Sequence, residues 1–152
     1  MPARKLKEFL DSQTVQYLKI AHSPAYTAQQ VARSLDVKGH MVAKTVIVFI
    51  DGKMAMAVMS ANRNINFDHF RKEIGAKEII LAAEGEFKDV FPDCEVGAMP
   101  PFGNLYGIEV YVDQYLTDDE EIFFNACSHS ELIRISYQDF ERLVKPKVVK
   151  LT

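Results

Sequence analysis

The chain has 152 residues, 48% hydrophobic and 26% charged, which is the composition of an ordinary globular protein of about one domain. Its formal net charge of −3 at pH 7 excludes a strongly basic protein that holds nucleic acid by bulk electrostatics, although a local basic patch is compatible with it. The N-terminal segment is charged throughout, and the longest apolar run, residues 45–50, is far too short to span a bilayer. We therefore expect a cytoplasmic protein that does not enter a membrane.

The first elements along the chain are a helix, an extended segment and a second helix. Apolar residues recur at helical spacing within residues 2–13, and residues 15–20 read as extended. Thr27 and Gln30 have the spacing of a capping box, in which the two side chains satisfy backbone N–H groups at a helix start. This pair predicts a helix beginning there.

The strongest local signal is a β-hairpin. Residues 44–50 and 53–59 are rich in β-branched and apolar side chains, and Asp51-Gly52 stands between them. This dipeptide is favoured in a type I′ turn, because both of its central positions require positive φ. The sequence therefore predicts two antiparallel strands joined by a tight turn.

The second half of the chain predicts further strands and helices, with no internal repeat or linker. A buried strand is expected over residues 77–82, and Ser136 with Asp139 indicates the start of a last helix. Together these patterns predict one α+β domain over residues 1–152 with a mixed or largely antiparallel sheet. The remaining predicted strands cover residues 107–113, 121–126 and 131–136, and the helices cover residues 67–75, 84–91 and 136–144.

The two cysteines, Cys94 and Cys127, form neither a C-x-x-C pair nor half of a zinc site. We interpret them as free thiols in a reducing compartment, with a single disulfide as the alternative. His40 and His69 have no partners at metal-ligand spacing, and no phosphate-binding or dinucleotide-binding glycine pattern occurs. No metal and no cofactor are therefore expected.

Lys44 stands immediately before the most apolar strand. One interpretation is a solvated lysine at a strand end, because buried lysines are rare. The other is a cation held against an apolar wall, where an ammonium group can bind a phosphate or polarise an ester carbonyl. Position alone does not choose between them.

The loop "GAMPPFGN", residues 97–104, contains no charged side chain. It can be a tight surface connection between strands. Alternatively, the backbone N–H groups of Gly97, Ala98 and Met99 can bind a developing oxyanion, while Pro100 and Pro101 stiffen the loop. The absence of polar side chains favours a role for the backbone.

Three other positions have both a structural and a chemical interpretation. Asp113 ends a predicted strand, and His22 precedes a predicted helix; both residue types are common in turns and loops. His129 follows Cys127 by two residues, so a Cys/His nucleophile pair has to be considered, although no third orienting group is evident.

Five segments in a fixed order resemble the YbaK family, which is related to the editing domain inserted in bacterial prolyl-tRNA synthetases. They are "HSPAYTAQQVA", "VAKTVIVFIDGKMAMAVM", "VGAMPPFGN", "VYVD" and "FFNACSHSELIRIS", and the resemblance extends from about His22 to Leu143. It implies a mixed α/β, barrel-like fold with flanking helices. It also implies hydrolysis of the ester bond of mischarged aminoacyl-tRNA by a protein acting free in solution.

The resemblance also implies roles for individual residues. The backbone of the loop Gly97–Pro101 would hold the ester carbonyl, and Lys44 would bind the terminal adenosine end or the ester. Asp113 would orient the lysine or the substrate amine. No protein nucleophile is implied; the terminal ribose 2′-hydroxyl would help to activate water, which suits an already activated ester. The expected substrate-binding residues are His22, Ala98, Met99, Pro100, Pro101, Gly103 and His129.

The expected partner is the acceptor end of a mischarged tRNA, with an aminoacyl-tRNA synthetase as a possible second partner. Candidate basic contacts are residues 3–7, Arg63, Arg71 with Lys72, and residues 145–150. Where many relatives carry glycine after Asn-Ala, this chain has Cys127, whose bulk leaves the substrate specificity open. The competing hypotheses are a non-catalytic module that binds aminoacyl-tRNA or a synthetase, and a thiol hydrolase that uses Cys127.

Overall fold

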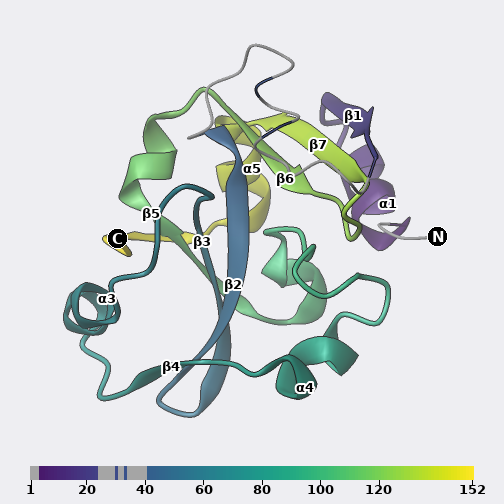
Figure 1. Ribbon diagram of the computed structural model, residues 1–152. Coiled ribbons are helices and arrows are strands. Elements are labelled where there is room, and N and C mark those ends of the chain that lie inside the picture. The colour runs from purple at the N-terminus through teal and green to yellow at the C-terminus, as the bar shows by residue number, and fades with distance from the viewer. Residues whose placement is uncertain (1–3, 24–29, 31–32, 34–40) are drawn as a thin grey trace.

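The computed structural model describes residues 4–23, 30, 33 and 41–152 (Figure 1). The predicted capping box at Thr27 and its helix lie outside these residues. In the described part of the chain, no helix has the length and hydrophobicity that a membrane span requires.

The strands form two sheets rather than one closed barrel. In the larger sheet, with strand order β4-β2-β3-β5-β8, β2 is antiparallel to β3 and β4, while β5 is parallel to β3 and β8. The smaller sheet, β1-β7-β6, is antiparallel. The strands are β1 (Tyr17–Ala21), β2 (Ala43–Ile50), β3 (Lys53–Ser60), β4 (Ile79–Leu81), β5 (Glu109–Asp113), β6 (Glu121–Asn125), β7 (Glu131–Ser136) and β8 (Lys147–Val149).

In the described part of the chain, four α-helices flank these sheets, which confirms the predicted α+β class with mixed strand directions. The first helix lies beside the smaller sheet, and α3 lies on the opposite side of the molecule (Figure 1). Ser136 Oγ accepts a hydrogen bond from Asp139 N at 3.1 Å, so the predicted cap of the last helix is confirmed. The helices are α1 (Arg4–Ser12), α3 (Phe67–Ile74), α4 (Glu84–Phe87) and α5 (Tyr137–Val144).

The predicted hairpin of β2 and β3 is also confirmed. Asp51 and Gly52 have φ values of 49° and 84°, as the turn requires. The register that follows places Lys44 opposite Met59 and Ala43 opposite Ser60. This register determines which residues lie next to Lys44.

Alternation along β2 directs side chains into two separate cores. Ala43 and Ile47 face the main core, which lies between the two sheets and includes side chains of α1 and α5. Val48 faces a second core, which α3 covers. The two faces of β2 therefore have different surroundings, and Lys44 belongs to the second face by its position.

Two predictions about strands were wrong or incomplete. The strand at residues 77–82 was expected to be buried, but β4 is a three-residue edge strand in which Ile80 and Leu81 are 49% and 61% exposed. The edge strand β8, which is parallel to β5, was not predicted, because residues 145–150 had been interpreted only as candidate basic contacts.

Candidate functional site

The two sheets meet at a small apolar cluster. Val42 bridges Phe123 in parallel, and both side chains, each 1% exposed, pack with Ile20 on the side of β6 that faces away from the main core. Because side chains alternate along a strand, His22 projects from the same side as Ile20, and Lys44 from the same side as Val42. The cluster therefore separates the lysine from the histidine on one continuous surface.

Lys44 lies at one end of this surface. Its Nζ donates a hydrogen bond to Asn64 Oδ1 at 3.4 Å, and partial burial lowers the pKa of its ammonium group. The described residues place no carboxylate within 4.0 Å of Nζ. Lys44 is thus a partly desolvated cation at the start of the apolar strand β2.

Asp113 lies on the same sheet face as Lys44, two strands away. Val58 pairs with Val112, so the next residue of each strand places Asp113 beside Met59, which pairs with Lys44. The Asp113 side chain is fully buried, and its carboxylate accepts hydrogen bonds from Leu151 N at 3.1 Å and Thr152 Oγ1 at 3.0 Å. Within the described residues, no hydrogen bond or ion pair joins Asp113 to Lys44.

The glycine loop begins with a tight turn at the other end of the surface. Ala98 N donates to Glu95 O at 3.0 Å, and Gly97 has a φ of 86°, which the third residue of a type II turn requires. This bond occupies the N–H of Ala98. The N–H groups of Gly97 and Met99 have no hydrogen-bond partner among the described residues.

The turn is fastened to the segment that follows β6. Glu95 N donates to Cys127 O at 2.8 Å, and Cys127 N donates to Ala98 O at 2.9 Å. Cys94 and Cys127 are joined in a disulfide, so the interpretation as free thiols was wrong. Two cysteines 33 residues apart meet because these backbone bonds bring their loops together. Asp93 lies close to both sulfur atoms, but a disulfide offers no thiolate to a metal.

His129 and His22 lie at the same end as the turn. His129 N donates to Glu95 Oε2 at 2.8 Å, and its Nε2 lies 2.9 Å from Val96 O. A Cβ atom at Gly97 would lie 3.5 Å from the His129 ring. His22 N donates to Ser130 O at 2.8 Å, and His22 Nε2 is buried without a hydrogen-bond partner.

The rest of the loop is internal. Pro100, Pro101 and Gly103 are buried, so the loop is not the surface connection that its turn residues also allowed. A Cβ atom at Gly103 would lie 2.7 Å from Ile108 O, so close packing requires this glycine. Of the loop residues predicted to act in the site, Gly97 alone is exposed; Asn104, at the end of the loop, is exposed as well.

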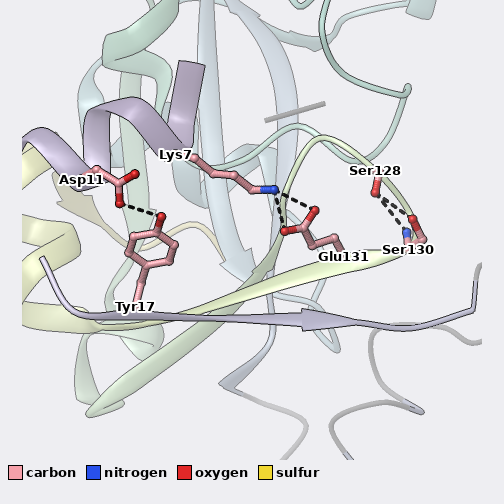
Figure 2. Close-up of polar contacts among 6 residues, drawn as sticks. All are labelled: Lys7, Asp11, Tyr17, Ser128, Ser130 and Glu131. Carbon is pink, nitrogen blue, oxygen red and sulfur yellow. Dashed lines mark hydrogen bonds and ion pairs between the residues drawn. The ribbon is translucent and has the colours of Figure 1, made fainter. Parts of the chain in front are cut away.

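Polar contacts stabilise the turn between β6 and β7, which carries His129 (Figure 2). Lys7 of α1 forms an ion pair with Glu131 at 2.8 Å, and Ser128 Oγ lies 3.1 Å from Ser130 Oγ. Nearby, Tyr17 donates to Asp11 at 2.9 Å and ties β1 to α1. Burial, together with this carboxylate, raises the pKa of Tyr17 to about 12, so the phenol remains a donor at neutral pH.

Sequence reasoning did not single out Glu95 or Asn64. Glu95 holds the backbone of His129, and Asn64 accepts the hydrogen bond from Lys44. The hairpin register identifies Met59 as the strand partner of Lys44, and it gives no signal for Asn64, which lies beyond the end of β3. Nor did a signal mark Glu95, whose partner is 34 residues away.

Comparison with known protein families assigns this chain to the aminoacyl-tRNA editing class. Residues 22–143 match the family described as "Aminoacyl-tRNA editing domain". The chain belongs to this family, and the resemblance seen in the sequence is confirmed.

Relatives include a prolyl-tRNA editing protein, ProX, from Acetoanaerobium sticklandii, which is 24% identical over 143 residues, covering 90% of this chain and 86% of ProX. A proline–tRNA ligase from Bacillus mycoides is 24% identical over 110 residues, or 72% of this chain, which spans only 19% of the ligase.

Solved structures share the fold at low sequence identity. A proposed trans-editing enzyme for prolyl tRNA synthetase has a TM-score of 0.84 and 16% identity, with 99% of this chain and 96% of that chain covered. The hypothetical protein APE2540 has a TM-score of 0.83 and 17% identity, with 97% and 99% covered.

Proposed function

We propose that this chain is a trans-acting deacylase that hydrolyses the ester bond of mischarged aminoacyl-tRNA. The observation that carries the proposal is the turn at Gly97: its backbone is fastened on both sides to Cys127, yet the N–H groups of Gly97 and Met99 have no partner among the described residues. Fixed donors without partners suit an oxyanion, because they need no reorganisation when charge develops. Membership of the editing family and the similarity to ProX support the same activity.

Lys44 contributes the positive charge in this proposal. A partly buried ammonium group is less well hydrated than one in water, so it binds an anionic or carbonyl oxygen more strongly. We assign it to the terminal adenosine end or to the ester itself. Asp113 acts indirectly, by fixing Leu151 and Thr152 against the sheet face that also carries Lys44. At the other end, His22 Nε2 is free to accept from or donate to a polar group of the substrate.

Water is the proposed nucleophile. It adds to the ester carbonyl carbon, and the carbonyl oxygen becomes an oxyanion held by the turn at Gly97. The bond from that carbon to the ribose oxygen then breaks, the ribose oxygen takes a proton, and the products are the free amino acid and tRNA. The disulfide removes the free thiol that hydrolysis by Cys127 requires. An activated ester needs mainly positioning and oxyanion stabilisation, so the site is chemically sufficient.

The test is a deacylation assay on one tRNA charged in turn with Ala, Ser, Thr, Cys and Pro. At least one ester should be hydrolysed well above its spontaneous rate, and Lys44→Ala and Gly97→Val should each reduce kcat/KM by roughly 100- to 1000-fold. Lys53→Ala is the matched control for charge, at the far end of the same hairpin. Gly52→Val is the control for backbone strain, because its φ of 84° is close to the 86° of Gly97.

The same variants separate catalysis from mere binding. If the two positions act on one transition state, the double variant should be little worse than either single variant. A non-catalytic module would instead show no rate above the spontaneous one, with Lys44→Ala weakening affinity. That result would refute the deacylase, and a synthetase or charged tRNA would then be the partner to test.

A further inference from the structure

Arg63 and Tyr115 form a stacked pair next to the lysine end of the site. The Arg63 guanidinium lies 3.9 Å from the centroid of the Tyr115 ring, and Tyr115 is 43% exposed. Arg63 immediately precedes Asn64, which accepts the hydrogen bond from Lys44, and Tyr115 follows Asp113 by two residues. Neither side chain takes part in the proposed chemistry, although Arg63 is next to Asn64 in sequence and Tyr115 is two residues from Asp113.

Hydrogen bonds to buried groups hold this pair in place. Arg63 Nη1 donates to Thr152 Oγ1 at 3.2 Å, and Thr152 Oγ1 donates to the buried Asp113 carboxylate at 3.0 Å. Arg63 N also donates to Ser60 O at 3.0 Å at the end of β3. An exposed arginine usually samples many rotamers, whereas this one is fixed over an aromatic ring by contacts with two other elements.

The charge on Arg63 is not neutralised by a carboxylate. Within the described part of the chain, six other cations form ion pairs with Asp or Glu, whereas no described carboxylate lies within 4.0 Å of Arg63; the paired cations are Arg4, Lys7, Arg71, Arg134, Arg142 and Lys147. Lys44 donates to Asn64, the residue that follows Arg63, and it too has no carboxylate within 4.0 Å among the residues that the structure describes. In a chain of net charge −3, two neighbouring cations of this kind mark a surface suited to an anion.

We propose that Arg63 and Tyr115 bind the single-stranded acceptor nucleotides that precede the terminal adenosine of the tRNA. One base stacks against the arginine–tyrosine pair, and the free N–H groups of Arg63 contact the adjoining phosphate. Stacking on an aromatic ring is the usual mode of single-strand recognition, and a guanidinium plane serves the same purpose. This inference rests on the proposed function, since it places the RNA so that its last nucleotide reaches Lys44.

The experiment compares two substrates with the same amino acid, a full aminoacyl-tRNA and an aminoacyl-adenosine that lacks the preceding nucleotides. Tyr115→Ala should lower kcat/KM on the tRNA by about 5- to 150-fold, chiefly through KM, and leave hydrolysis of the aminoacyl-adenosine unchanged. Tyr115→Phe keeps the ring and should behave as wild type. Arg63→Gln should reduce the magnitude of the salt slope of tRNA binding by about 0.7, whereas the control Arg142→Gln, whose arginine is paired with Asp139, should not.

Fluorescence anisotropy with uncharged CCA-ended RNA supplies a readout that does not depend on catalysis. Tyr115→Ala should weaken this binding by a similar factor. An equal loss on both substrates would mean a structural role for Tyr115 and would overturn the proposal, as would unchanged binding and turnover of the tRNA. If the wild type hydrolyses neither substrate, the deacylase fails, and the anisotropy result still decides whether the pair binds RNA.

Discussion

Opening the disulfide between Cys94 and Cys127 should destabilise the fold by an amount that follows from its loop length. The bond closes a loop of 33 residues, and the chain-entropy model then gives about 3.7 kcal/mol of stabilisation at 25 °C. For a chain of this size, about 2 to 4 °C per kcal/mol corresponds to a fall in Tm of roughly 7 to 15 °C. The variant Cys94→Ser is preferred, because it leaves Cys127 and its backbone conformation in place.

The assay is urea unfolding and thermal unfolding with and without dithiothreitol, after alkylation and mass spectrometry have established the thiol state. The wild type should lose stability on reduction, whereas Cys94→Ser should start lower and not respond to the reductant. A wild type whose unfolding is indifferent to reduction would refute the reasoning. Hydrolysis that rises on reduction and disappears on alkylation of Cys127 would restore the thiol hydrolase.

Two further predictions concern Lys44 and Gly103. Burial lowers the pKa of Lys44, so enzymatic deacylation, corrected for the spontaneous rate, should decline as pH rises through a value below that of an ordinary lysine. Lys44→Arg should remove this decline, because arginine stays charged, and a decline shared by both proteins would exclude Lys44 as its source. Gly103→Ala forces a carbon to within 2.7 Å of Ile108 O and should lower the free energy of unfolding by roughly 1 to 3 kcal/mol. Urea unfolding with Gly85→Ala as the control measures it, because Gly85 has open space, and equal stability of the two variants would contradict the packing argument.

Local signals in the sequence predicted local structure well. The Asp51-Gly52 turn and the Ser136 cap depend on residues within a few positions of each other, so the chain itself contains the information. Local sequence signals could not predict that β4 is exposed. Its apolar residues look buried in sequence, but whether a further strand covers an edge is decided by the order of strands in the sheet.

The sequence indicated which residues belong to the proposed site better than it indicated their contacts with one another. Lys44 and the Gly97 loop stand out by their composition, whereas the partners of Asp113 lie 38 and 39 residues further on, at positions to which the sequence assigned no role. The same limit applies to the disulfide. Long-range pairing depends on how loops return to each other, and no spacing rule connects two cysteines that belong to different loops.

Cys127 stands where many relatives of the family carry glycine, and its surroundings in the structure show what this difference affects. Glycine is expected there, and the φ of 65° explains the preference, since a residue with a Cβ atom pays roughly 1 to 2 kcal/mol in this region. The disulfide offsets that strain, because its expected stabilisation of about 3.7 kcal/mol is larger. The Cys127 side chain is fully buried and bonded to Cys94, so its sulfur is held in a covalent bond rather than exposed to a substrate. The replacement of glycine by cysteine therefore bears on the rigidity of the proposed oxyanion-binding turn, and selectivity among amino acids has to come from other side chains.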